Sequence, residues 1–371
     1  MSVDFDVTQP ARFLPAGLTA LLHGSATDTV RSGQPDRAVL DEVRRSGLLA
    51  AGVPVEYGGS GGDAALVNQV VERVATVNPS VAIIVFQHFA VSARITEWGT
   101  GSQKDRLLPR LARGDLLAAS AWSEPGAGAA KKKISTTATP LPGGRWVLDG
   151  AKSFTTGAGV ADLYLVLAGT GPPHENTRSD YGSAGQSFFL VPAESRGVVP
   201  DLSMDLVGMR GSATGFVTLR RCEVSDADRL GPVGHAPAII AGVRESGVTL
   251  GAVSVGIGQA LLDLAAARVA NGKLPAARLV DLATRVEAAR ALVTCAGQRV
   301  SPNVGMTTLH SKLFASVVAE QVGSEVARLM GSAGYVVGNE VNRLLADARA
   351  VALMGPTNEL CRELVTNAWR T

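Results

Sequence analysis

Residues 118–138, AASAWSEPGAGAAKKKISTTA, are followed four residues later by residues 143–166, GGRWVLDGAKSFTTGAGVADLYLV. Short apolar runs alternate here with glycine-rich turn signals, which is typical of strands joined by tight turns. Gly143–Gly144 and Asp149–Gly150 are predicted as such turns. Two further apolar runs, SFFLVP and TGFVTLRRCEV, continue the pattern. The stretch therefore predicts a middle β domain, built as a small barrel or sandwich.

The regions on both sides of this β domain are rich in helix formers, with apolar residues at helical spacing. Pro54 and a cluster of glycines in GVPVEYGGSGGD mark a loop between two helical segments. The long, weakly polar segments after the β domain are typical of a helical bundle or a subunit interface. The predicted helices cover residues 37–51, 64–75, 81–97, 104–114, 248–270, 279–293 and 309–330.

The order of these patterns predicts an α+β chain of three domains. Residues 1–116 form an N-terminal helical domain, residues 117–226 the middle β domain, and residues 227–371 a C-terminal helical domain. A length of 371 residues suffices for this organisation and for a sizeable core.

The composition excludes several classes of protein. Apolar residues make up 46% and charged residues 18%, so the chain is globular rather than disordered. The net charge of +2, without a basic stripe, gives no reason to expect nucleic-acid binding. Cys222, Cys295 and Cys361 lie far apart without a CxxC pair, which predicts reduced thiols, no metal site and a cytoplasmic protein.

Neither a signal peptide nor a membrane span is expected from the sequence. The start, MSVDFDVTQP, lacks a basic segment followed by an apolar one. The most apolar run, Val81–Val91, is interrupted by Gln87 and His88 and is shorter than the ~18 residues of a span. We interpret it as a buried helix.

The two segments that open this section resemble the acyl-CoA dehydrogenase family, where they read approximately TEPGAGSD and DGxKxWITN. The likeness continues upstream in EWGTGSQKDRLLPRLARGD and downstream in GMRGSATGFVTLRRCEV and GSAGYVVGNEVNRLLADARAVALMGPTNELCRE. The resemblance implies an N-terminal helical domain, a middle β domain and a C-terminal four-helix bundle. It also implies FAD, a homo-oligomer, and oxidation of acyl thioesters between the α and β carbons. In that reaction a carboxylate removes the α proton while flavin N5 accepts the β hydride.

The resemblance further implies flavin contacts from the middle domain. Ser123 matches a Ser or Thr that donates to a flavin carbonyl, and Trp122 would contribute its backbone. Thr156, preceded by Thr155, matches a hydroxyl residue near flavin N5. Phe154 replaces a Trp that packs on the ring, and it keeps the apolar face without the N–H. The alternative interpretation of these hydroxyls is ordinary turn and strand polarity.

The C-terminal part supplies further cofactor positions by the same resemblance. Thr357 matches a flavin-contacting Thr, and Glu359 matches the acidic or amide residue after it. Arg328 replaces a Gln three positions before Gly331, where GSAGY begins, and a guanidinium there could hold the FAD diphosphate or simply lie on the surface. The family's RxxFG element, which reaches the FAD of a neighbouring subunit, is absent. The segment where the family carries it, between two long helices, reads AARVANGKLPAARLVDLATRVEAAR here and is shorter by roughly ten residues.

Gly355 falls on the family's catalytic Glu, and a glycine cannot accept a proton. Its backbone N–H could still polarise the thioester carbonyl. Glu245 is a candidate replacement base, although Ser246 falls on the position that some relatives use. One helical step turns a side chain by about 100°, so Glu245 reaches the pocket only if the register shifts. Otherwise it complements the positive end of a helix.

Three functions follow from these features. The first is a FAD-dependent, acyl-thioester dehydrogenase-like oxidoreductase acting on CH–CH bonds, with an acyl-CoA or acyl-carrier-protein substrate and an atypical active site. The second is a non-catalytic or half-site subunit that pairs with a related chain. The third is a flavin-dependent monooxygenase on the same fold. Lys131, Lys132 and Lys133 could meet phosphates of the substrate, or they form a solvated loop.

Overall fold

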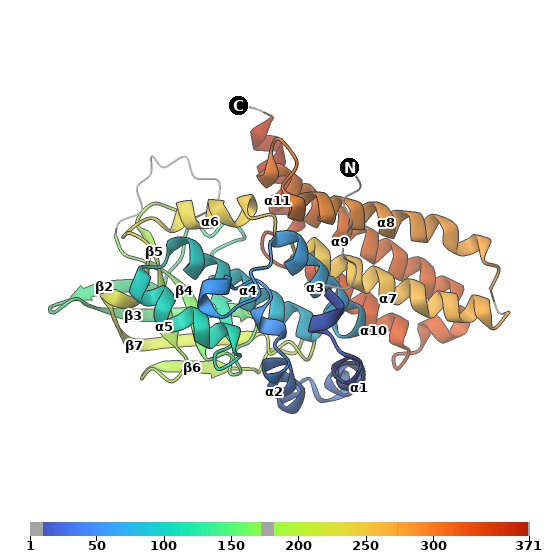
Figure 1. Ribbon diagram of the computed structural model, residues 1–371, viewed down its shortest axis with the longest axis horizontal. Helices are drawn as coiled ribbons and strands as arrows, with labels where there is room; N and C mark the ends of the chain where they lie inside the picture. Colours follow the sequence, from blue (N-terminus) through green and yellow to red (C-terminus); the bar gives the residue numbers. More distant parts are fainter. Residues whose placement is uncertain (1–9, 172–181, 273, 370–371) are drawn as a thin grey trace.

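The computed structural model describes residues 10–171, 182–272 and 274–369 (Figure 1). A β-sheet lies at one end of the molecule, a bundle of long helices at the other, and the N-terminal helices lie across the middle. The N-terminal part contains η1 (Pro10–Phe13), α1 (Ala16–Ser32), α2 (Arg37–Arg45), η2 (Leu48–Ala50), η3 (Val55–Tyr57), α3 (Ala64–Val77), α4 (Pro79–Trp98) and α5 (Gly101–Ala112).

The caps of the N-terminal helices explain where they begin and end. Asn78 caps α4 by accepting the Val81 N–H, and Thr100 and Gln103 form a reciprocal capping box on α5. The predicted helix over 37–51 is wrong in its second half, because α2 ends at Arg45. Gly47 then adopts a left-handed φ of 79°, which stops the helix and leaves only the short turn η2.

The strands pair in one sheet in the order β6-β7-β3-β2-β4-β5-β8, and β1 pairs in parallel with β4. Alternating burial along β7 and near-complete burial of β4 and β5 fit a sheet that packs against helices. The strands are β1 (Ala118–Ala121), β2 (Thr137–Leu141), β3 (Arg145–Thr155), β4 (Leu163–Gly169), β5 (Gln186–Pro192), β6 (Val198–Asp201), β7 (Gly215–Ser225) and β8 (Arg229–Leu230).

One of the two predicted turns is confirmed and the other is wrong. Gly143 and Gly144 both have positive φ and join β2 to β3, where Leu141 pairs with Arg145. Asp149–Gly150 instead lies inside β3, at a bulge opposite β7. A Cβ on Gly150 would lie 2.4 Å from Thr136 Oγ1, so the glycine permits a close approach of the neighbouring chain rather than a turn.

The C-terminal part begins with α6 (Ala236–Glu245), after which four long helices pack against one another as a bundle. These are α7 (Gly251–Ala270), α8 (Ala277–Gln298), α9 (Val304–Leu329) and α10 (Glu340–Leu353), followed by α11 (Asn358–Ala368). The short helices η4 (Asp226–Asp228) and η5 (Gly331–Tyr335) complete the described elements. The predicted domain boundaries fall between α5 and β1 and within η4, and they stay predictions.

Helices α4 and α7 are both long and apolar enough to cross a membrane by length and composition alone. In the structure, 72% of the apolar window of α4 and 61% of that of α7 are buried inside the fold. The predicted helix over 81–97 corresponds to α4, and the run Val81–Val91, interpreted as buried, contributes to the main core.

Candidate active site

A cavity of about 860 Å³ lies where the helical domain, the sheet and the C-terminal helices meet. Its size lies near the upper end of the range for ligand sites. Side chains of α4 form one wall, and the ends of β1 and β3 form another. The remaining walls come from residues 204–209, from α6, and from the connection between α10 and α11. The cavity therefore draws on all three parts of the chain.

The β wall brings together four residues that the sequence analysis selected. Trp122 and Ser123 follow β1, whereas Phe154 lies at the end of β3, one residue before its last, and Thr156 comes just after the strand; all four line the cavity. A hydrogen bond of 2.9 Å from the Ser153 N–H to the Ser123 carbonyl joins the two strand ends. Phe154 has a φ of 52°, and its side chain is two-thirds exposed. This backbone turns a large apolar ring out of the sheet at the edge of the cavity.

Several buried donors in the β wall and in α4 have no hydrogen-bond partner among the described residues. They are the Trp122 indole Nε1, the Thr155 hydroxyl and the Arg94 Nη1. Burying such a group without a partner costs about 1–3 kcal/mol. Trp122 and Arg94 line the cavity, so a bound ligand with oxygen acceptors would supply the missing partners. Arg94 was missed in the sequence analysis, although a lone arginine in the apolar α4 was a visible signal.

The loop that carries Ser123 is held by a fully buried ion pair. Lys152 Nζ donates to Glu124 Oε1 at 2.6 Å, and both side chains are at most 1% exposed. Burial alone would raise the pKa of Glu124, but the Lys152 ammonium and hydrogen bonds from Lys152, Thr136 and Ser135 hold it at about 2. Glu124 lines the cavity, yet its charge is committed to this loop. It is thus a structural anchor rather than a free base.

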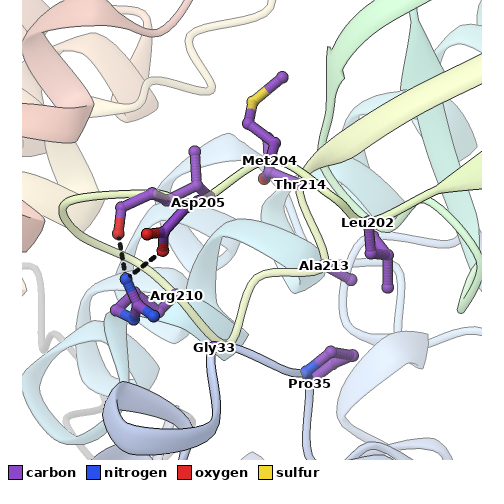
Figure 2. Close-up of a pocket in the computed structure, with 9 residues that line it drawn as sticks. Gly33, Pro35, Leu202, Met204, Asp205, Arg210, Ala213 and Thr214 are labelled. Atoms are coloured by element: carbon purple, nitrogen blue, oxygen red, sulfur yellow. Dashed lines mark hydrogen bonds and ion pairs between the residues drawn. The ribbon is translucent and has the colours of Figure 1, made fainter.

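The second carboxylate of the cavity wall is also paired. Arg210 Nη1 donates to Asp205 Oδ1 at 2.6 Å and to the Leu206 carbonyl at 2.8 Å (Figure 2). The same guanidinium reaches the Val30 carbonyl from Nε, and thus ties this loop to the end of α1. Figure 2 shows the small pocket between Arg210 and Pro35 that lies behind the loop. Glu124 and Asp205 are the only carboxylates among the described residues that line the large cavity.

The opposite wall is the connection between α10 and α11. Met354, Gly355, Pro356 and Thr357 all line the cavity. Thr357 also caps α11, because its Oγ1 accepts the Leu360 N–H at 3.2 Å. Gly355 and Thr357 thus lie in the same cavity as the residues of the β wall, and their roles there stay predictions.

Asp347 on α10 holds residues 204–209 against the bundle. Its Oδ1 accepts the Met209 N–H at 2.5 Å, and Arg343 lies 3.4 Å from Oδ2. Burial raises the pKa of Asp347 to about 6, although the Met209 N–H and Arg343 act in the opposite direction. The folded protein therefore binds the proton on this carboxyl more tightly than the unfolded chain does.

We expect Asp347→Asn to change how stability depends on pH. With a raised pKa, the folded state binds the proton more tightly than the unfolded state, so stability falls as pH rises from about 4 to about 6. Asn keeps an acceptor for Met209 and does not titrate. Urea unfolding measures the free energy of unfolding at pH 4.5 and at pH 6.5. Between these two pH values the wild-type protein should lose about 2 kcal/mol that the variant does not lose. Equal pH dependence in both proteins would contradict the assignment.

Other predicted residues lie outside the cavity. The Glu245 side chain is exposed and lies against Gly305 in the first turn of α9, whereas Ser246 lines the cavity. The register of α6 thus turns Glu245 away, and the expectation of a base at this position is corrected: the carboxylate complements the positive end of α9.

The remaining cofactor candidates lie on the outside of the helical part. Arg328 pairs with Glu325 and Glu359 with Arg362, and the Arg328 and Glu359 side chains are largely exposed. Gly331 begins η5 with a φ of 63°. Because the resemblance places part of this region against the FAD of a neighbouring subunit, these three roles stay predictions.

The three lysines after the GAG turn are not equivalent. Lys131 is buried, lines the cavity and donates to the Ala129 carbonyl, and desolvation lowers its pKa to about 8. Lys132 and Lys133 are exposed. The alternative of a solvated loop therefore fits only the last two.

Family models match almost the whole chain in a consistent order. The acyl-CoA dehydrogenase N-terminal domain matches residues 21–115, the middle domain residues 119–222, and the C-terminal domain residues 238–369. The chain is 31% identical over 342 residues to an acyl-CoA dehydrogenase of Bacillus subtilis, covering 88% of each chain. It is also 31% identical to a cyclohex-1-ene-1-carbonyl-CoA dehydrogenase of Syntrophus aciditrophicus, covering 85% of this chain and 78% of the relative.

Solved structures show the same architecture. Butyryl-CoA dehydrogenase from Megasphaera elsdenii superposes with a TM-score of 0.88 at 26% identity, with both chains fully covered. The prolyl acyl carrier protein oxidase AnaB shares the fold with a TM-score of 0.82 at 23% identity, covering 98% of this chain and 99% of that one.

Proposed function

The chain belongs to the acyl-CoA dehydrogenase family of flavin-dependent oxidoreductases, and we propose that it binds FAD and an acyl thioester in the cavity described above. The observation that carries the proposal is the convergence of the β wall and the α10–α11 connection on one cavity. The names of the relatives above 30% identity refer to acyl groups on coenzyme A, so we take a CoA thioester as the substrate.

The residues of the β wall fit the isoalloxazine part of FAD. Trp122 lines the cavity and its Nε1 is buried without a partner among the described residues, and a flavin offers carbonyl and ring-nitrogen acceptors to such a donor. The Thr155 hydroxyl is also unpartnered among these residues, but Thr155 does not line the cavity, so its cofactor role stays a prediction. The exposed Phe154 ring offers an apolar face for stacking. Ser123 and Thr156 complete the residues that would hold the ring. When bound, FAD supplies the acceptor for a hydride from the substrate.

The residues opposite this wall would bind and orient the thioester. We place the thioester carbonyl at the Gly355 N–H, which polarises it by hydrogen bonding. No side chain at that position accepts the α proton, and Glu124 and Asp205 are each held by a cation. The proposed site thus keeps binding and polarisation, while general-base catalysis from this position is missing.

The visible absorption spectrum of the purified protein, before and after addition of FAD, tests cofactor binding. We expect the two bands of oxidised flavin and FAD near one equivalent per chain. The substitution Phe154→Ala should lower FAD retention on a desalting column, whereas Phe314→Ala, a control on the exposed side of α9, should not. A colourless protein that does not take up FAD would contradict the proposal.

A second candidate function is a half-site subunit that pairs with a base-bearing relative. The missing side chain at Gly355 and the commitment of Glu124 to a buried ion pair favour it, because neither position offers a free base in this chain. Co-expression with a related chain would then yield a hetero-oligomer with thioester oxidation that neither chain shows alone. A stable, fully flavinated homo-oligomer that oxidises acyl-CoA by itself would remove the support for this candidate.

A further inference from the structure

Lys312 is a lysine buried between α9 and the last two helices. It lies in the first half of α9 and is 3% exposed. Placing an ammonium group in such a position costs several kcal/mol unless hydrogen bonds satisfy its donors. The proposed chemistry makes no use of Lys312, which does not line the cavity.

The partners of Lys312 lie on both sides of the α10–α11 connection. Nζ donates to the Ala352 carbonyl at 3.2 Å and to Asn358 Oδ1 at 2.7 Å. Ala352 belongs to the last turn of α10, whose carbonyls have no partner within the helix. Asn358 is the first residue of α11. One ammonium group therefore joins the end of one helix to the beginning of the next.

The segment between these two contacts is the wall of the active-site cavity. All five residues from Leu353 to Thr357 line the cavity, including Gly355. A further contact of 3.7 Å from Cys361 Sγ to the Pro356 carbonyl lies on the α11 side of the segment. Ser316, one turn after Lys312, also donates to Asn358 Oδ1, at 3.0 Å, but has no bond to Ala352. Lys312 is thus the side chain in the described structure that binds both ends.

We propose that Lys312 is a positioning residue: by binding Ala352 and Asn358 it fixes the path of residues 353–357 and the direction of the Gly355 N–H. The inference rests on the proposed function, since it assigns that N–H to the thioester carbonyl. Loss of the ammonium group would leave the segment anchored at one end only, and thioester binding would then have to order it.

The charge of Lys312 offers an independent readout. Burial lowers its pKa to about 8, and Cys361, Arg362 and Glu320 are the titratable and charged groups around it. The protonated amine donates to both acceptors, whereas deprotonation weakens these bonds. The affinity for a thioester should therefore fall, relative to that for a thioether, as pH rises from 7 to 9. The comparison is needed because Lys131 lines the cavity and its pKa is also about 8.

The experiment compares two ligands by isothermal titration calorimetry on the flavin-loaded protein. Hexanoyl-CoA carries the thioester carbonyl, and S-hexyl-CoA is a thioether that lacks it. We expect Lys312→Met to raise the Kd for hexanoyl-CoA by about tenfold and to change the Kd for S-hexyl-CoA by less than about twofold. Ser316→Ala, the matched control, removes one hydrogen bond to Asn358. It should change the Kd of each ligand by less than about twofold.

Each outcome decides between the proposals. Equal weakening of both ligands by Lys312→Met, or equal effects of the two variants, would overturn the positioning role. If Lys312→Met does not fold, the wild-type protein still gives the test, since a ratio of the Kd for hexanoyl-CoA to the Kd for S-hexyl-CoA that is constant from pH 7 to 9 would also overturn it. If the wild-type protein binds neither ligand, the proposed function fails instead.

Discussion

Replacing Gly355 by Glu is expected to accelerate acyl-CoA oxidation by about 10²–10⁴-fold over the wild-type protein. The new carboxylate would enter the cavity wall opposite the β-wall residues, next to the proposed thioester carbonyl. Gly355 is not among the glycines with positive φ, so a side chain is compatible with its backbone. The measurement is the rate at which hexanoyl-CoA bleaches the oxidised-flavin absorbance in a stopped-flow instrument.

The control for this gain is Gly355→Gln, which has the same size and no basic carboxylate. The Gln variant should bind hexanoyl-CoA with an affinity similar to that of the Glu variant and bleach the flavin at the wild-type rate. Equal rates for the Glu and Gln variants would mean that position 355 does not face the α carbon. A fast wild-type rate would show that another group already serves as the base.

Lys152→Met is expected to destabilise the protein by about 3–5 kcal/mol. The substitution leaves the Glu124 carboxylate buried without its counter-ion, since Lys152 and Glu124 are at most 1% exposed. The backbone N–H groups of Ser135 and Thr136 still donate to Glu124 but carry no net charge. Urea unfolding followed by tryptophan fluorescence gives the change in the free energy of unfolding.

Two further variants isolate the cause of this loss. Glu124→Gln combined with Lys152→Met removes both charges and should recover part of the stability, because neither member of the pair is left charged without the other. Arg145→Met breaks the pair with Glu223, whose side chains are about half exposed, and should cost at most about 1 kcal/mol. A cost for Lys152→Met as small as that for Arg145→Met would refute the role of the buried pair.

The fold was largely predictable because its signals are local. Helical spacing predicted α3, α4, α7, α8 and α9, and short apolar runs predicted β3, β4, β5 and β7. The misassigned Asp149–Gly150 shows the limit of such signals. The dipeptide is typical of a turn, but pairing with β7 keeps β3 continuous, and the absence of a Cβ admits Thr136. Long-range pairing thus overrode a local preference.

The orientation of single side chains depended on distant parts of the chain. Glu245 and Ser246 are neighbours in sequence, and only the packing of α6 decides that Ser246 lines the cavity while Glu245 lies against α9. Arg94 was visible as a charge in an apolar helix, but its unpartnered Nη1 was not. One helical step changes the direction of a side chain by about 100°, so small errors of register exchange buried and exposed residues.

By itself, the sequence determined the order of helices and strands, the family resemblance, and the absence of an acid or base at Gly355, since residue identity and local periodicity carry these properties. Only the tertiary structure decided that Glu124 and Asp205 are held by cations, and that Lys312 binds both ends of the segment containing Gly355. The physical reason is that charge pairing and hydrogen bonding depend on distances of a few ångströms. Folding sets those distances between residues that are far apart in the chain.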